Sequence, residues 1–259
     1  MYNRRTIVFT AFLCLLVGIQ CAYCQQDAHR FLRWTVNDPV DMFSNIGSRE
    51  VLRGTSVGLG IAAISLSDGP LSTNIQDQYK GSPVLNFTNR WGEWPLAVSV
   101  SAGIFGASLL TKNSKFQDVA FTSLQSLVMT NLTVNAGKFL FARKRPHTNE
   151  GPYEMEFAEL GHTSLPSGHT ATAFALVTPW VIYYPNVFTY SMMAIPVGTA
   201  IARVAKGRHW LSDVTAGAAI GFSMGYYLSK KHLNIQSKRF EITPSAGSNS
   251  VALRVNFSF

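Results

Sequence analysis

The chain has few cysteines, and all of them lie near its N-terminus. Cys14, Cys21 and Cys24 are the three cysteines of the 259-residue sequence. If the segment that carries them is cleaved, the mature chain has no thiol, so neither a disulfide nor cysteine redox chemistry is expected. This suits an exported protein that works with other side chains.

Charged residues are also scarce. They make up 14% of the chain, against 47% hydrophobic residues, whereas an average soluble domain has about 25% charged residues. The mean hydropathy of +0.11 is modest for a protein with many membrane spans, so composition leaves a membrane protein and a soluble bundle both open. The net charge of +8 favours anionic ligands or an anionic membrane surface. No basic and aromatic tract occurs, so no nucleic-acid partner is expected.

The first 24 residues have the organisation of an export signal. Arg4 and Arg5 precede an apolar run from Thr6 to Ile19, and small residues follow around Ala22. The alternative is a retained transmembrane helix, but the run is shorter than the roughly 20 residues that span a bilayer. No Pro/Gly/Ser-rich linker divides the rest of the chain. The predicted organisation is a signal peptide at residues 1–24, a helical domain at residues 25–235 and a tail at residues 236–259.

Six apolar stretches follow the signal, and they are rich in Ala, Gly, Ser and Thr. They are Val51–Ser67, Pro95–Leu110, Val119–Gly137, Thr170–Tyr184, Val187–Ala202 and Val214–Leu228. Each is just shorter than a bilayer-spanning helix, so length alone does not separate spanning from packing. We expect an all-α bundle of about six core helices, embedded in a membrane; a soluble periplasmic bundle is the alternative.

The positions of lysine residues favour one topology in the inner membrane. If Val51–Ser67 does not span, the other five stretches alternate consistently, with Lys112, Lys115, Lys230 and Lys231 on the cytoplasmic side. Polar segments 138–169 and 203–213 then face the periplasm. If all six stretches span, both segments face inward.

The tail has a different pattern from the rest of the chain. Residues 240–244 and 251–259 alternate apolar and polar side chains on either side of a Ser/Gly/Asn turn, which predicts a β-hairpin. Two strands cannot close a barrel, so we expect a small appended hairpin. Export of this tail would contradict the cytoplasmic placement of the lysines before it.

Two cations precede the first polar loop. Lys138 and Arg145 are about two helical turns apart, so they share a face if the helix continues to Arg145 and stops at Pro146. Arg grips phosphate bidentately and Lys adds a point charge. The alternative is a basic membrane-flanking cluster that includes Arg143 and Lys144.

The segment Pro166-Ser167-Gly168-His169 directly precedes an apolar helix. Ser167 or the neighbouring backbone amides can cap this helix and donate to an anion, while Gly168 allows close approach. His169 then projects from the first turn. An ordinary capped helix start with a surface histidine is the alternative.

The third polar cluster contains His209 and Asp213, one helical turn apart. On one helical face the carboxylate can fix the imidazole tautomer and support a cationic ring. Arg203 precedes them across a predicted loop at residues 206–208. This pattern is weak alone, but the three clusters in order predict a phosphate-handling site.

Together, Lys-x6-Arg-Pro, Pro-Ser-Gly-His and Arg-x5-His-x3-Asp resemble the three signature motifs of the type 2 phosphatidic acid phosphatase superfamily. The resemblance implies that His209 is a nucleophile that forms a phosphohistidine, that Asp213 orients it, and that His169 protonates the leaving alcohol. It also implies phosphate binding by Lys138, Arg145, Ser167, the Gly168 amide and Arg203. No metal or other cofactor is implied. Ala202 stands where the family usually has Ser, which implies the loss of one supporting hydrogen bond.

The substrate is the least constrained part of the prediction. We expect a metal-independent phosphatase for lipid phosphate monoesters or pyrophosphates, and Glu150, Glu154, Glu156 and Glu159 would tune its selectivity. His147 and His162 bracket the same loop and are expected at the surface. The alternatives are a soluble periplasmic phosphatase for small esters, a vanadium-dependent haloperoxidase with His209 as vanadate ligand, and an inactive membrane scaffold. The chain is short for a haloperoxidase.

Overall fold

The computed structural model describes residues 25–44, 46–158, 164–237, 240–247 and 250–257. The predicted export signal, residues 1–24, lies outside these residues. The chain divides into two compact units, Met1–Ile46 and Gly47–Phe259. The first unit is described by one helix, α2 (Gln25–Ser44). The predicted domain boundaries at residues 25 and 236 remain predictions.

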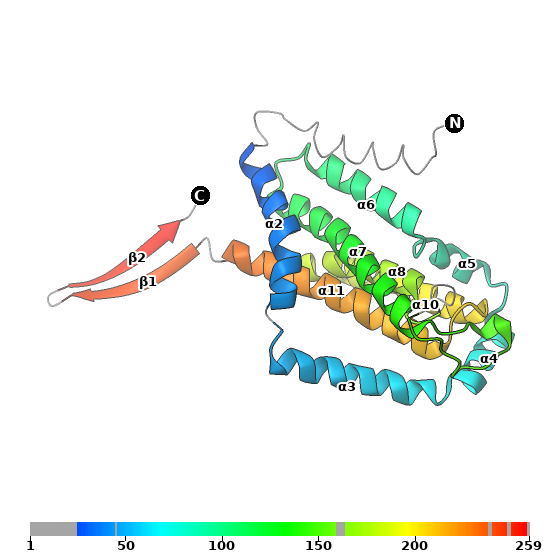
Figure 1. Cartoon of the computed structure of the whole chain (residues 1–259). Helices are drawn as coiled ribbons and strands as arrows, with labels where there is room; N and C mark the ends of the chain where they lie inside the picture. The colour runs from blue at the N-terminus through cyan, green and yellow to red at the C-terminus, as the bar shows by residue number, and fades with distance from the viewer. Residues whose placement is uncertain (1–24, 45, 159–163, 238–239, 248–249, 258–259) are drawn as a thin grey trace, which may run out of the picture. The chain divides into compact units, whose positions relative to one another are not determined.

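The second unit is a helical bundle followed by two strands (Figure 1). Its elements are α3 (Ser48–Ser65), α4 (Asp68–Tyr79), α5 (Pro83–Arg90), α6 (Trp94–Ser108), α7 (Ser114–Phe141), the 3-10 turn η1 (Pro146–Thr148), α8 (Gly168–Tyr183), α9 (Val187–Ser191), α10 (Ala194–Ala205), α11 (Leu211–Ser237), β1 (Phe240–Gly247) and β2 (Ser250–Phe257). The predicted all-α bundle is confirmed, because all six apolar stretches are helical.

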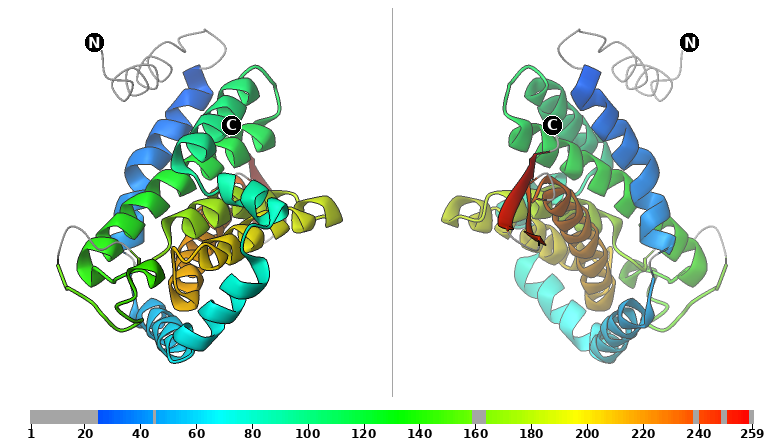
Figure 2. Two further views of the ribbon diagram at one scale, coloured as in Figure 1. Left: turned by 90° about the vertical axis from the view of Figure 1, so that its right-hand side faces the viewer. Right: turned by 90° about the vertical axis from the view of Figure 1, so that its left-hand side faces the viewer.

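Helices α7, α8 and α11 form the centre of the bundle and lie side by side in every view (Figures 1 and 2). Small residues let α11 touch the backbone of α8. A Cβ atom on Gly217 would lie 2.4 Å from the Ser167 carbonyl oxygen, and one on Gly221 would lie 2.2 Å from the Ala171 carbonyl oxygen. This close approach places the N-terminus of α8 beside the first turn of α11.

The remaining helices surround this centre. Helix α6 packs on α7, α3 packs on α11, and α10 contacts α4, α5 and α8. The stretch predicted at Val187–Ala202 is divided into α9 and α10, because Pro196 has no N–H to donate to the Met192 carbonyl. Helices α4 and α5 lie outside the predicted apolar stretches, and their buried residues are polar: Asp68, Ser72, Thr88 and Asn89.

Strands β1 and β2 pair antiparallel, with Phe240 opposite Phe257 and Gly247 opposite Ser250. They lie where the alternating pattern predicts a hairpin, and they form a two-stranded sheet.

Large apolar side chains are exposed over much of the bundle. Leu110 is 90% exposed, Val187 85% and Phe188 74%, and α3 has no buried residue. Within the described part of the chain, Val187–Ala205 is the one segment with the length and apolar composition of a membrane span, and 39% of its apolar window is buried. One such segment does not decide between a membrane bundle and a soluble one.

Candidate functional site

The three predicted polar clusters meet at the N-terminal end of α8. His169, in the first turn of α8, lies close enough to Lys138, Arg145, Arg203 and His209 for their charges to act on it. A Cβ atom on Gly168 would lie only 3.3 Å from the Lys138 Nζ. The end of α7, the start of α8 and the α10–α11 turn therefore contribute to one site, which contains three cations and two histidines.

The turn between α5 and α6 supports His169 from one side. A Cβ atom on Gly92 would lie 2.6 Å from the His169 carbonyl oxygen and 2.8 Å from the His169 Cβ. Only glycine fits this contact without displacing α8. Sequence reasoning did not find this support, since Gly92 belongs to no polar cluster.

Arg203 is buried on α10 with spare donor capacity. Its Nη1 donates to the Asn89 Oδ1 at 3.4 Å, and its buried Nε has no hydrogen-bond partner among the described residues. Buried guanidinium donors are normally satisfied, so an unpaired N–H at this position suits an anion that binds here. Asn89 is on α5, a helix that the sequence did not predict.

Lys138 and Arg145 do not share a helical face, so that expectation was wrong. Helix α7 ends at Phe141, and Ala142 has a left-handed backbone with φ of 38°. Residues 143–145 run extended beside residues 154–156, as the hydrogen bond from the Lys144 N to the Glu154 O at 3.0 Å indicates. Arg145 therefore belongs to a loop. Burial lowers its pKa, the nearby Arg208 lowers it further, and Asp213 opposes the change.

His209 precedes α11, so His209 and Asp213 do not share a helical face either. Its Nδ1 lies 2.8 Å from the Ser164 carbonyl oxygen and 3.7 Å from the Asp213 Oδ2. A carbonyl only accepts, so Nδ1 carries the hydrogen and Nε2 keeps its lone pair. Burial lowers the pKa of His209 to about 4, although Asp213 opposes this shift. The ring is therefore neutral near pH 7, as a nucleophile requires.

Asp213 acts on His209 directly, through the carboxylate 3.7 Å from Nδ1, and also through other residues. Its Oδ2 accepts from the Ser164 hydroxyl and from the Trp210 N at 2.9 Å. Its Oδ1 accepts from the Arg143 Nη1 at 2.7 Å. Ser164 is thus the direct orienting group of the imidazole, and Asp213 fixes Ser164. No sequence signal identified Ser164, which belongs to none of the three motifs.

Arg143 is part of this interior and not of a membrane-flanking cluster. Its side chain is 1% exposed and pairs with Asp68 and Asp213. Its neighbour Lys144 is partly exposed and forms ion pairs with Glu150 and Glu156. The acidic loop is therefore partly neutralised.

The remaining predicted residues are Ser167, His147, Glu159 and His162. Ser167 is buried, and its hydroxyl lies 3.1 Å from the Thr170 Oγ1, so it does not cap a first-turn amide. Its phosphate-binding role stays a prediction. His147 lies at the surface, with Nδ1 3.3 Å from the Gly207 carbonyl oxygen. Glu159 and His162 lie outside the described residues. Within the described ranges, His, Cys, Asp and Glu form no group of three that could hold a metal ion.

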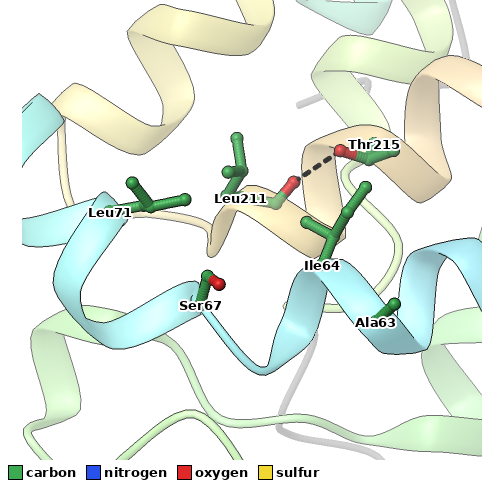
Figure 3. Close-up of a pocket in the computed structure, with 6 residues that line it drawn as sticks. All are labelled: Ala63, Ile64, Ser67, Leu71, Leu211 and Thr215. Carbon is green, nitrogen blue, oxygen red and sulfur yellow. Dashed lines mark hydrogen bonds between the residues drawn. The ribbon is translucent and has the colours of Figure 1, made fainter.

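A pocket of about 390 Å³ lies between α3, α4 and the start of α11. Figure 3 shows the side chains that line it: Ala63, Ile64, Ser67, Leu71, Leu211 and Thr215. It contains neither histidine of the site and none of its cations. The pocket is thus separate from the phosphate-handling site.

Comparison with known proteins confirms the resemblance that the motifs carry. The sequence model of the PAP2 superfamily matches residues 120–236, which include Lys138, His169, Arg203, His209 and Asp213. This segment of the chain is similar to the PAP2 superfamily. The phosphate-handling residues thus lie inside the PAP2 segment, while Asp68 and Asn89 lie before it.

Two curated relatives of this chain are lipid A 1-phosphatases. The protein from Porphyromonas gingivalis is 40% identical over 102 residues, which is 37% of this chain and 20% of the relative. The protein from Rhizobium johnstonii is 31% identical over 100 residues, which is 37% of this chain and 41% of the relative. The matches span less than half the length of either relative.

The fold of the chain is similar to that of a solved structure. This is a transmembrane PAP2 type phosphatidylglycerolphosphate phosphatase from Bacillus subtilis, with a TM-score of 0.52 and 20% sequence identity. The similarity covers 72% of this chain and 98% of the solved chain. At this identity the likeness concerns the fold.

Proposed function

We propose that this protein is a lipid phosphate phosphatase that works through a phosphohistidine on His209. The observation that carries the proposal is a neutral, buried imidazole whose Nδ1–H is held by the Ser164 carbonyl, placed among the cations Lys138, Arg145 and Arg203. Relatives named as lipid A 1-phosphatases support a lipid phosphate as substrate.

The first step transfers the phosphoryl group to the enzyme. The Nε2 of His209 attacks phosphorus while the bond to the leaving oxygen breaks, and His169 gives a proton to that oxygen. Burial and the nearby cations lower the pKa of His169 to about 3 in the free site, so the bound phosphate anion must supply the charge that keeps this ring protonated. The three cations and the Gly168 amide stabilise the charge on the non-bridging oxygens. The ring becomes cationic when its Nε2 is phosphorylated, and the Ser164 carbonyl and the Asp213 carboxylate offset that charge.

The second step restores the free enzyme. Water attacks the phosphohistidine, His169 accepts a proton from the water, and inorganic phosphate leaves. His209 returns to its neutral form, with the hydrogen still on Nδ1. His169 thus acts first as acid and then as base, which requires no cofactor in the scheme.

We further place the protein in the inner membrane, with the site on the periplasmic side. The exposed apolar side chains of the bundle support contact with lipid, and the predicted export signal and lysine distribution support this orientation. A soluble periplasmic phosphatase for small esters is the second candidate, because only one described segment has the length and composition of a membrane span.

The decisive experiment measures phosphate release by the full chain purified in detergent. A lipid A-type 1-phosphate, phosphatidylglycerol phosphate and a water-soluble aryl phosphate are compared, with His209→Ala as control. We expect turnover of the lipid phosphates, loss of turnover in the variant, and an acid-labile phosphoenzyme in the parent protein after rapid quenching. Equal turnover of the aryl phosphate by detergent-free protein would favour the soluble candidate. Activity in His209→Ala would refute the phosphohistidine.

A further inference from the structure

A buried chain of charges connects α4 to the site. The Arg143 guanidinium donates from Nη2 to the Asp68 Oδ2 at 2.7 Å and from Nη1 to the Asp213 Oδ1 at 2.7 Å. Its Nε donates to the Pro152 carbonyl oxygen at 2.8 Å. The side chain of Arg143 is 1% exposed, and those of Asp68 and Asp213 are 0% exposed. Three charged groups from three segments thus share one water-excluded space.

The same charges hold the start of α11. The carboxylate of Asp68 accepts from the Ser212 N at 2.8 Å and from the Ser212 hydroxyl. The Arg143 Nη1 also donates to the Ser212 Oγ at 2.7 Å, and the guanidinium lies 5.7 Å from the centre of the Trp210 ring. Residues 210–213, which follow His209 directly, are therefore fixed from two sides.

Packing alone does not explain this arrangement. Burying charges costs several kcal/mol per ion, and an apolar replacement of similar shape is often at least as stable. However, these charged groups have hydrogen-bond partners, and the last of them, Asp213, accepts from the Ser164 hydroxyl. The Ser164 carbonyl oxygen in turn holds the ring of His209. A rigid ionic link is useful where the direction of one carboxylate matters.

We propose that Arg143 and Asp68 are positioning residues for phosphoryl transfer, which fix the Asp213 carboxylate and thereby the orientation of His209. The inference rests on the proposed role of His209 as nucleophile. Arg143 contacts Asp213 and Asp68 contacts Ser212, so both act on His209 through the residues that follow it.

The two residues also act on the charge near His209, in opposite directions. The charged and titratable groups around this ring are Asp213 on α11, Arg203 on α10, Arg145 after α7, and His169 on α8. The cation of Arg143 weakens the influence of the Asp213 carboxylate, and the anion of Asp68 partly restores it. Removal of Arg143 should therefore make protonation of His209 easier, and removal of Asp68 should make it harder.

The experiment compares variants of the full chain in detergent, using the lipid phosphate that the parent protein hydrolyses. The variants are Arg143→Gln, Asp68→Asn and the double variant, with the neighbouring, partly exposed Lys144→Gln as matched control. We measure kcat, KM, Tm and the acid limb of the profile of kcat/KM against pH. For Arg143→Gln we expect kcat to fall about 10- to 100-fold, with KM changed much less and the acid limb moved to higher pH.

Asp68→Asn should lower kcat less and move the acid limb to lower pH, and the double variant should return the limb towards that of the parent protein. Lys144→Gln should match the parent protein in kcat and in the limb. If Arg143→Gln does not fold, Asp68→Asn decides alone, because Asn keeps the shape of the side chain. An acid limb unmoved in every folded variant, with losses that follow only the amount of folded protein, would overturn the proposal. Activity in His209→Ala would instead refute the proposed function, so the two failures are distinguishable.

Discussion

Replacing Gly217 by Ala tests how closely α11 and α8 must approach for the site to form. The new Cβ atom would lie 2.4 Å from the Ser167 carbonyl oxygen, closer than the 3.0 Å that such atoms normally keep. Backbone atoms cannot turn aside, so the helices must separate by roughly half an ångström or more. Overpacking of this kind costs about 1–3 kcal/mol. It exceeds the gain of about 1 kcal/mol that Ala normally brings to a helix.

The displaced segment carries Gly168 and His169, so catalysis should suffer together with stability. A misplacement approaching 1 Å can reduce the rate about 100-fold, and we expect kcat to fall about 10- to 100-fold for Gly217→Ala. The measurements are Tm in detergent and kcat with the best lipid phosphate. For a chain of this length, each kcal/mol corresponds to about 2–4 °C in Tm.

Gly103→Ala is the matched control for this prediction. Gly103 is inside α6, and a Cβ atom there would have nothing within 4 Å. This substitution should leave kcat unchanged and leave Tm equal or slightly higher. If Gly217→Ala behaves like Gly103→Ala in both measurements, α8 and α11 do not approach as described, and the reasoning about how the site is assembled is wrong.

Three further predictions concern single groups of the site. Because burial lowers the pKa of His209 to about 4 and the neutral ring is the nucleophile, the loss of kcat/KM on the acid side of the profile should have its midpoint near pH 4. A midpoint near pH 6.5 would contradict this. Asn89→Ala removes the acceptor of the Arg203 Nη1. Loss of this hydrogen bond, worth about 1 kcal/mol, should raise the inhibition constant of inorganic phosphate about fivefold. The exposed Asn86→Ala should leave that constant unchanged. Asp213→Asn breaks a buried ion pair with Arg143, which should lower the free energy of unfolding by about 3–5 kcal/mol. Tm and kcat should therefore fall, and the acid limb of the kcat/KM profile should move to lower pH. An unchanged Tm would count against the pairing.

The sequence was sufficient for the central helices and for the residues that the structure gathers at the site. The apolar stretches identified the central helices, because each of these helices is one continuous apolar segment of the sequence. The positions of Lys138, His169 and His209 followed from their residue types and spacing. These signals are local, and each lies within one segment of the chain.

The missed features depend on contacts between distant segments. Helices α4 and α5 bury polar residues such as Asp68 and Asn89, so their patterns resemble surface helices until their partners, Arg143 and Arg203, are known. The end of α7 at Phe141 has no Gly or Pro to mark it. Its left-handed Ala142 is strained and is held by pairing of the next residues with the loop.

The start of α11 was misplaced for a related reason. Asp213 is the third residue of this helix, and its carboxylate accepts from the backbone N–H of Trp210, which precedes the helix. This is half of a capping box, in which an acid in the first turn reaches back to the N-cap residue. The same spacing that suggested a shared helical face thus marks a helix start, and it leaves His209 outside the helix.

The segment between Arg143 and Ser164 starts and finishes at one point of the molecule, because the Ser164 N donates to the Arg143 carbonyl oxygen at 3.0 Å. The two ends of this segment therefore meet at a closed base, and both residues of that base also contact Asp213. Apart from Arg145, a cation of the site, and Pro152, whose carbonyl oxygen accepts from Arg143, the segment can vary without moving the reacting groups. Evolution, or a protein engineer, can thus graft new recognition loops at this base while the chemistry beneath them is inherited intact.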